Sequence, residues 1–183
     1  ATQLSLFSVA EITDDVEVAR VRKLRLPSVP SEPLFMDEKE ANKTNTLVVT
    51  SEEALSVLVK SLRDAGRFAL DTESTSEDPW HAELVGISVS MAAGEAYYIP
   101  VGHVQTVDGQ EPGFQLPKDL ILEKLRPVLE DSQIQKYMHN AKYDMQLFVR
   151  SGIAVQGLAF DTMVGTYLTD PGRRGLGLKD QVF

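Results

Sequence analysis

Two short stretches of the sequence carry carboxylates where a buried strand or helix ordinarily carries apolar side chains. The first is RFALDTES, residues 67–74, which predicts a strand. Side chains alternate along a strand, so Asp71 and Glu73 share one face while Phe68 and Leu70 share the other. Two carboxylates on one face repel each other and resist burial unless a cation or hydrogen-bond donors offset the charge.

The second stretch is HNAKYDMQLFVRSG, residues 139–152, which predicts a helix over residues 141–151. At helical spacing Asp144 shares the inward stripe with Leu147 and Phe148. Each stretch also has an ordinary interpretation. Asp144 would simply flank the stripe near a helix start, where negative charge is favourable, and the strand acids would be a strand end that emerges into solvent.

Together, two acids from a strand and one from a helix that can pack beside it would form an oxygen-only cluster. Hard oxygen ligands select Mg²⁺ or Mn²⁺ over zinc. The absence of cysteine and the presence of only three histidines also disfavour a zinc centre. A pair of such ions can ionise a water for attack on a phosphodiester and stabilise the leaving oxygen.

The surrounding pattern predicts the elements that position these acids. Residues 1–46 have little periodicity and three prolines, which indicates a linker or loosely attached arm, and residues 47–183 form the ordered domain. Strands are expected at residues 46–49, 67–74, 83–91, 96–101 and 134–138. Helices are expected after the capping pair Thr50 and Glu53, from Pro117, over 141–151 and within 175–183. Strands that meander and then alternate with helices predict an α/β fold with a mixed sheet.

Composition limits the classes of function. A formal net charge of −9 disfavours a free-standing protein that binds nucleic acid mainly through basic residues on its phosphates. It leaves open a tethered catalytic module whose bound metal ions supply the positive charge. No run of residues is long and apolar enough to span a bilayer, and the N-terminus lacks signal-peptide order. We therefore expect a cytoplasmic protein with no membrane partner.

Four motifs carry a family resemblance. FALDTES and HNAKYD resemble the first and second exonuclease motifs of the DEDD superfamily, and residues 157–180 resemble the segment that follows in ribonuclease D and in the proofreading domain of bacterial DNA polymerase I. AYYIPVGH, residues 96–103, is most similar to the polymerase I branch, family A. The resemblance implies a ribonuclease-H-like fold that removes nucleotides from a DNA 3′ end and releases nucleoside 5′-monophosphates.

The resemblance also implies roles for individual residues. Asp71, Glu73 and Asp144 match the catalytic acids that bind two Mg²⁺ or Mn²⁺ ions, while Thr72, Asn140 and Tyr143 match positions on the substrate side of the site. An aromatic ring beside a single strand is suited to stacking. Alternatively, Asn140 is a helix cap and Tyr143 a ring at the core edge. Four further residues are expected to be structural: Asp161 as a helix cap, Trp80 as a packed loop anchor, and His103 and His139 as satisfied histidines. The alternative for Trp80 is a position at the border of the DNA cleft.

Two positions depart from the family pattern. The third motif, Tyr-x-x-x-Asp, supplies a fourth acid and a water-orienting tyrosine, and no such pattern lies between Asp161 and Phe183. We therefore expect a C-terminally incomplete domain, a fragment of a longer protein, that is weakly active or inactive alone. The alternative is a chain whose own site is incomplete. Glu77 also stands where polymerase proofreading domains commonly place an apolar side chain that wedges against the terminal bases. Either the wedge is altered here, or the motif aligns one or two residues away.

The N-terminal sequence QLSLF resembles the short peptide by which bacterial replication proteins dock on the sliding clamp. Gln3 would form hydrogen bonds, and Leu4, Leu6 and Phe7 would supply apolar contacts. A small hydrophobic staple at a domain edge is the alternative. With a clamp peptide, residues 1–46 would be an interdomain linker, with a 5′-nuclease domain upstream of it and a tethered polymerase domain downstream of residues 47–183.

Two other functions remain open at this point. One is a ribonuclease D-like enzyme that trims RNA 3′ ends with the same acids. The other is a non-catalytic scaffold or clamp-binding module that has kept the fold and lost the chemistry. Metal binding separates the scaffold from the enzymes, and a comparison of DNA with RNA 3′ ends separates the two enzymes.

Overall fold

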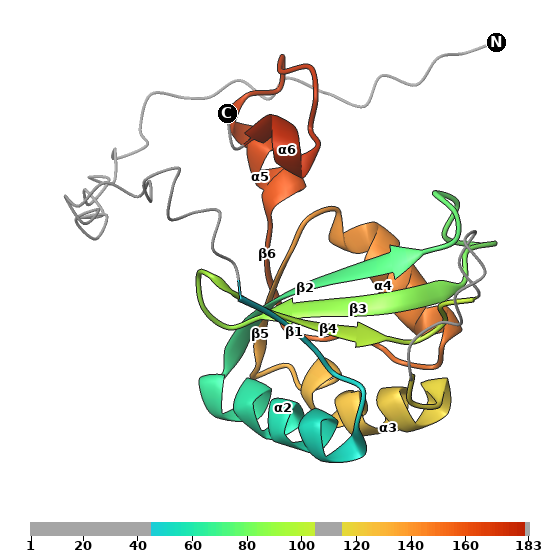
Figure 1. Cartoon of the computed structure of the whole chain (residues 1–183). Helices are drawn as coiled ribbons and strands as arrows, with labels where there is room; N and C mark the ends of the chain where they lie inside the picture. The colour runs from blue at the N-terminus through green and yellow to red at the C-terminus, as the bar shows by residue number, and fades with distance from the viewer. Residues whose placement is uncertain (1–44, 105–114, 182–183) are drawn as a thin grey trace, which may run out of the picture. The chain divides into compact units, whose positions relative to one another are not determined.

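A six-stranded mixed sheet forms the centre of the protein (Figure 1). The computed structural model describes residues 45–104 and 115–181. The strand order is β1-β4-β3-β2-β5-β6; β2 pairs antiparallel with β3 and β3 antiparallel with β4, and the other three pairings are parallel. The strands are β1 (Asn45–Val48), β2 (Arg67–Ser74), β3 (Leu84–Ser90), β4 (Glu95–Pro100), β5 (Gln135–Met138) and β6 (Leu158–Asp161).

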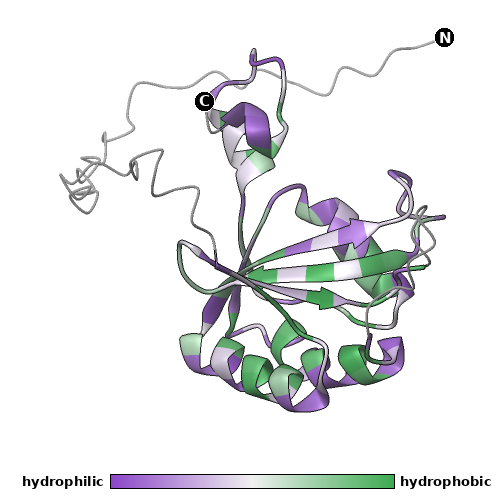
Figure 2. Cartoon of the chain, viewed as in Figure 1, coloured by the Kyte–Doolittle hydropathy of each residue, from purple (hydrophilic) through white to green (hydrophobic). Residues whose placement is uncertain are grey.

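Three helices, which begin at Glu52, Lys118 and Ala141, bury one face of this sheet. The described helices are α2 (Glu52–Ala65), α3 (Lys118–Leu129), α4 (Ala141–Arg150), α5 (Thr162–Thr169) and α6 (Leu178–Gln181). Figure 1 shows α2 and α3 beneath the strands, and Figure 2 shows hydrophobic residues alternating with hydrophilic ones along both helices. The core joins side chains of α2, α3 and α4 to the inward residues of the strands, among them Phe68, Leu70, Ile87, Val89 and Ile99. No described helix is long and apolar enough to cross a membrane.

The other face of the sheet is open over its central strands. Direct partners across β2 and β3 pair Asp71 with Ser88 and Glu73 with Gly86. Because partners in an antiparallel ladder point to the same face, these residues lie opposite to the core residues Leu70 and Ile87. A cavity of about 320 Å³ lies on this face, bordered by Asp71 and by Leu178 of α6. The sheet therefore presents its two strand acids on an uncovered surface.

The local predictions are confirmed for the mixed sheet and for most elements, with two differences. The cap of α2 is Ser51, whose hydroxyl accepts from the Ala54 N–H at 3.2 Å, so the predicted capping pair of Thr50 and Glu53 is wrong by one residue. Strand β6 was not predicted, because its four residues LAFD include no residue buried in the core. The predicted domain boundary at residues 46 and 47 stays a prediction.

One buried cation fixes the strand that leads into α4. Lys136 of β5 is 0% exposed, and its ammonium donates to the carbonyl of Asp131 at 2.7 Å and lies 5.8 Å from the centre of the Phe68 ring. Burial lowers the pKa of Lys136 to about 8, against the nearby charge of Asp131. The lysine thereby connects β5 to the turn after α3. Strand β5 immediately precedes the segment that carries Asn140 and Asp144.

Candidate metal and substrate site

The two acids of β2 lie on the open face, as the alternation predicted. Asp71 and Glu73 are both exposed there. Partial burial and the negative charge of Glu73 raise the pKa of Asp71, while a hydrogen bond from the backbone of Thr72 and the proximity of His139 act in the opposite direction. The two carboxylates therefore repel each other in the metal-free protein, and a bound cation would relieve that repulsion.

The third acid lies behind them. Asp144 is only 3% exposed, on the inward side of α4 with Leu147 and Phe148, as predicted. The Thr72 hydroxyl donates a short hydrogen bond to Asp144 Oδ1, which joins α4 to β2. Burial raises the pKa of Asp144 to about 7; this hydrogen bond opposes the shift and the negative charge of Asp71 adds to it. The side chain of Thr72 is thus engaged with Asp144, and its substrate contact stays a prediction.

The donor chemistry of these residues fits a hard divalent cation. All three groups are carboxylates, and two of them have pKa values raised partly by a neighbouring negative charge. Within the described residues, however, no three Asp, Glu, His or Cys side chains close into a metal-binding cluster. The arrangement is an open pair, Asp71 and Glu73, with Asp144 buried behind Thr72.

A polar cavity of about 580 Å³ lies at the end of β2, next to these acids. It is lined by residues 72–77 together with Asn140 and Tyr143. Asn140 precedes α4 in the left-handed region, with φ 58°, and its side chain makes no capping hydrogen bond, so the structure does not support the helix-cap alternative. The Tyr143 hydroxyl bonds to Ser74 Oγ and to the carbonyl of Ser76, which fixes its ring against the loop. Glu77 lines the same cavity.

Asp161 supplies the cap that Asn140 does not. One oxygen accepts from the backbone N–H groups of Asn140, Met163 and Val164, and the other accepts from Ala141 at 2.8 Å. The predicted role of Asp161 as a cap for the following helix is confirmed, and the same carboxylate also caps α4. His139 is a satisfied histidine, as expected, with Nδ1 2.8 Å from the Thr162 hydroxyl.

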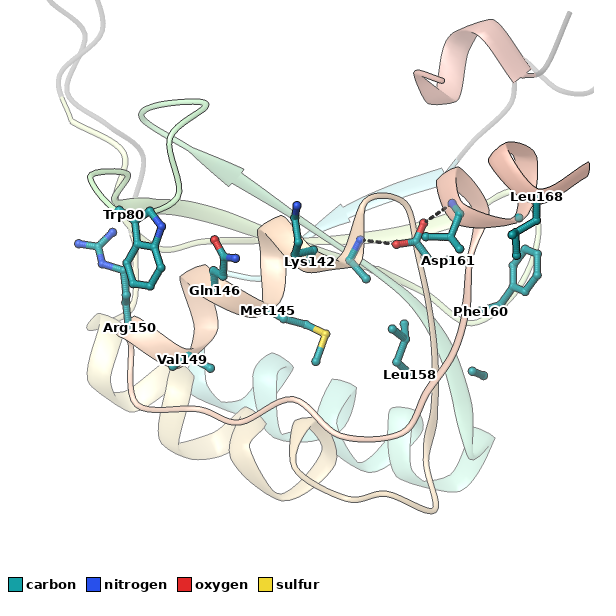
Figure 3. Close-up of a pocket in the computed structure, with 14 residues that line it drawn as sticks. Trp80, Lys142, Met145, Gln146, Val149, Arg150, Leu158, Phe160, Asp161 and Leu168 are labelled. Atoms are coloured by element: carbon teal, nitrogen blue, oxygen red, sulfur yellow. Dashed lines mark hydrogen bonds between the residues drawn. The ribbon is translucent and has the colours of Figure 1, made fainter. Parts of the chain in front are cut away.

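An apolar groove between α4 and the β6–α5 segment was not predicted (Figure 3). It encloses about 750 Å³, and its lining includes Met145, Leu158, Phe160, Val164 and Leu168. Trp80 stands at one end of it beside Arg150, as Figure 3 shows, and is 67% exposed. The expectation that Trp80 is a packed loop anchor is therefore wrong. The sequence did contain a signal for this groove. Residues 158–168 include more apolar side chains than a strand and a helix exposed to solvent would need.

The predicted clamp peptide, Gln3, Leu4, Leu6 and Phe7, lies outside the described residues. It remains a prediction from the sequence. The described site therefore comprises six of the predicted residues: three acids, Thr72, Asn140 and Tyr143. The structure brings these six to one end of β2 and the start of α4.

Comparison with known proteins gives consistent matches. A sequence model of the 3′–5′ exonuclease family matches residues 47–182. DNA polymerase I of Chloroflexus aurantiacus is 37% identical over 182 residues, which cover 96% of this chain and 18% of that protein. The chain spans less than a fifth of the length of this protein and of DNA polymerase I of Pseudomonas aeruginosa, another curated relative that it matches.

Two solved structures show the same fold at low sequence identity. The POL domain of Pol1 from M. smegmatis, in complex with DNA primer-template and dNTP, aligns with a TM-score of 0.57 at 23% identity over 74% of this chain and 21% of that one. Trypanosoma brucei RNase D in complex with RNA U12 aligns with a TM-score of 0.54 at 19% identity over 71% of this chain and 42% of that one. These likenesses support the ribonuclease-H-like fold. Since the family model covers more than half of the sequence and the relative named above matches nearly all of it, the chain belongs to the 3′–5′ exonuclease family found in DNA polymerase I.

Proposed function

We propose that this chain is the proofreading module of a DNA polymerase, which hydrolyses the 3′-terminal phosphodiester of DNA and releases nucleoside 5′-monophosphates. The observation that carries the proposal is the hydrogen bond from the Thr72 hydroxyl to Asp144, which holds a buried carboxylate of α4 against the strand that carries Asp71 and Glu73. The two bonded residues lie 72 positions apart in sequence. Burial, to which the charge of Asp71 adds, raises the pKa of Asp144, and a bound cation would offset the negative charge of these neighbouring acids.

The residues of the site divide into two groups. Asp71 and Glu73 would hold Mg²⁺ or Mn²⁺ from the open face, and Asp144, once ionised, would add negative charge behind them. When bound, two such ions supply an ionised water and neutralise the leaving oxygen. Asn140 and Tyr143 line the adjacent polar cavity and would orient the terminal nucleotide there. Thr72 would contribute by holding Asp144 against β2.

Tethering would account for the acidic charge of the chain. A net charge of −9 gives a free-standing module poor affinity for DNA phosphates. The relatives are more than five times as long and are named DNA polymerase I, so a polymerase domain in the same protein would hold the duplex. The frayed 3′ end would then be presented at a high local concentration.

Mn²⁺ binding and 3′-end hydrolysis test this proposal together. The purified chain is expected to bind Mn²⁺, as measured by titration calorimetry, and to shorten a 5′-labelled DNA strand slowly from its 3′ end with enzyme in excess. Asp71→Asn is expected to lower the Mn²⁺ affinity at least about tenfold and to abolish shortening, because removal of one anionic ligand weakens a hard-cation site. Glu77→Gln, which removes a charge from the adjacent polar cavity, is the matched control and is expected to change the affinity little.

Three results would contradict the proposal in different ways. Absence of Mn²⁺ binding to the unsubstituted chain would favour a non-catalytic scaffold. Faster shortening of RNA than of DNA would favour a ribonuclease D-like enzyme. Equal Mn²⁺ affinities for the Asp71→Asn variant and the unsubstituted chain would place the metal elsewhere.

We also propose that residues Gln3 to Phe7 bind a sliding clamp. Gln3 would form a hydrogen bond, and Leu6 and Phe7 would insert into an apolar pocket of the clamp. A pull-down with purified clamp is expected to lose its signal when Leu6 and Phe7 are both replaced by alanine. Replacing Ile12 and Val16, an apolar pair in the same arm, is the matched control and is expected to leave the signal unchanged. A signal that survives the Leu6 and Phe7 substitutions would contradict the docking role.

A further inference from the structure

Tyr98 of β4 crosses the open face of the sheet toward the row of residues that contains Glu73. A Cβ atom built on Gly86 of β3 would clash with the phenol, at 2.0 Å from the Tyr98 hydroxyl oxygen and 2.4 Å from the ring carbon that bears it. The phenol therefore fills the place of a Gly86 side chain, and only glycine leaves that space. A ring that lies over a neighbouring strand in this way is fixed in direction by the backbone beneath it.

The strand register shows what the hydroxyl faces. Gly86 is the direct partner of Glu73 in the antiparallel pair of β2 and β3. Direct partners carry Cβ atoms roughly 5 Å apart on the same face. Since the Tyr98 hydroxyl oxygen lies 2.0 Å from the place of a Gly86 Cβ, the Glu73 carboxylate, two bonds beyond its own Cβ, can reach it. The negative charge of Glu73, second to burial, raises the pKa of Tyr98, which agrees with this proximity.

His103 holds the phenol from the other side. Its Nε2 lies 2.6 Å from the Tyr98 hydroxyl, and the two rings meet edge to face with centroids 5.8 Å apart. The backbone of His103 is itself fixed, since its N–H donates to Gln115 Oε1 and its carbonyl accepts from Gln115 Nε2, both at 2.8 Å. The preceding N–H groups of Val101 and Gly102 both donate to the Val85 carbonyl at 2.9 Å. The histidine is therefore held more firmly than an exposed side chain alone would be.

We propose that Tyr98 is a positioning residue for the metal site, and that its hydroxyl accepts a hydrogen bond from His103 Nε2–H and donates one to the Glu73 carboxylate. This inference rests on the proposed function, because Glu73 is there a metal ligand. A carboxylate held by one donor keeps a single orientation, so less side-chain freedom is lost when the ion binds. It also gives His103 a role beyond that of a satisfied structural histidine.

The contact can be tested without metal. In the full chain labelled with ¹⁵N-histidine, at fixed pH, the imidazole nitrogen signals of His103 are expected to shift in Tyr98→Phe and in Glu73→Gln. The first removes the acceptor of Nε2–H, and the second changes the group to which Tyr98 donates. Two matched controls are expected to leave the signals in place: Tyr97→Phe, on the core side of the same strand, and Glu77→Gln. Unchanged His103 signals in Glu73→Gln would overturn the proposal.

Mn²⁺ affinity then tests the consequence. Tyr98→Phe is expected to weaken Mn²⁺ binding roughly tenfold, the usual worth of a hydrogen bond to a charged group, with Tyr97→Phe unchanged. Gly86→Ala, which displaces the hydroxyl while keeping it in the protein, is expected to give the same loss, and His103→Gln a smaller one. Unaltered affinity in both Tyr98→Phe and Gly86→Ala would overturn the positioning role while leaving the proposed function intact. Failure of the unsubstituted chain to bind Mn²⁺ would instead overturn the proposed function, and the His103 signals would still decide the contact.

Discussion

Replacing Asp144 with asparagine is expected to stabilise the metal-free protein at pH 8 by about 3 kcal/mol and to lower its metal-dependent hydrolysis roughly a hundredfold. The stability gain arises because Asp144 is buried and its pKa in the folded protein is about 7, far above the ordinary value of 3.8. At pH 8 the fold must therefore hold an ionised carboxylate that burial disfavours. The asparagine carbonyl can still accept the Thr72 hydrogen bond without that charge.

The sign of the pH dependence follows from the same values. An acid whose pKa is higher in the folded than in the unfolded state binds protons more readily when folded. The stability that Asp144 contributes is therefore complete below pH 3.8 and is lost as the pH rises through about 7. Asp144→Asn removes this dependence, so the difference in free energy of unfolding between variant and unsubstituted protein should grow across that window and level off above it.

Urea denaturation at pH 5 and pH 8 in the presence of a chelator measures the difference. Glu77→Gln is the control, because it removes an exposed acid near the same site. A loss of stability at pH 8 on Asp144→Asn would contradict the expectation and would show that the ionised carboxylate is well compensated in the folded protein. A gain of stability with unimpaired hydrolysis would show instead that Asp144 takes no part in the chemistry.

The periodic features of the site could be predicted from sequence, because each depends on one element. Alternation along β2 is enough to separate Asp71 and Glu73 from Phe68 and Leu70. Helical spacing is enough to place Asp144 on the buried side of α4, since the side chains of one turn share a direction whatever packs against them. The mixed sheet follows from the order of the elements in the same way.

Features that depend on two distant segments could not be predicted. The Thr72 hydroxyl points away from the strand acids and bonds to Asp144, 72 residues later. No local pattern specifies such a pairing, so the sequence indicated three converging acids where the structure has an open pair with a third acid behind it. The Tyr98 phenol over Gly86 is a second example, because a glycine in a strand signals a close approach without naming the group that approaches.

The failures at the caps have a different cause. Thr50 and Ser51 are adjacent hydroxyl residues before the same helix, and either can cap it, so the choice depends on where the chain leaves β1. At α4 the residue in the cap position, Asn140, is a good capping type, yet a carboxylate from another segment takes its place. Asn140 adopts left-handed backbone dihedrals, which asparagine tolerates, and its side chain remains available to the polar cavity.

Asp161→Ala is expected to destabilise the protein by about 3 kcal/mol, since one carboxylate caps two helices and a lost cap ordinarily costs about 1 kcal/mol or more. Four backbone N–H groups lose their acceptor at once: those of Asn140 and Ala141 at the start of α4 and those of Met163 and Val164 in α5. Burial acts to raise the pKa of Asp161, but these four donors outweigh it and the pKa lies below its ordinary value. The contribution of Asp161 is therefore present above pH 3.8 and lost as the pH falls below it.

Asp161→Asn distinguishes capping from charge. Asparagine keeps one accepting oxygen, which can serve Asn140, Met163 and Val164, but it turns an amide NH₂ toward the N–H of Ala141. The Asp161→Asn variant should therefore lose less stability than Asp161→Ala. Its loss should be concentrated in α4, with faster amide exchange at Ala141 than at Val164. Asp170→Ala, at the opposite end of α5, removes an acid where negative charge is unfavourable to a helix, and is expected to leave stability unchanged or slightly higher. Equal exchange at both helices in Asp161→Asn would mean that charge alone matters. Faster exchange confined to α4 would mean that Asp161, at the end of β6, fixes the first turn of α4. That turn carries Tyr143 and Asp144.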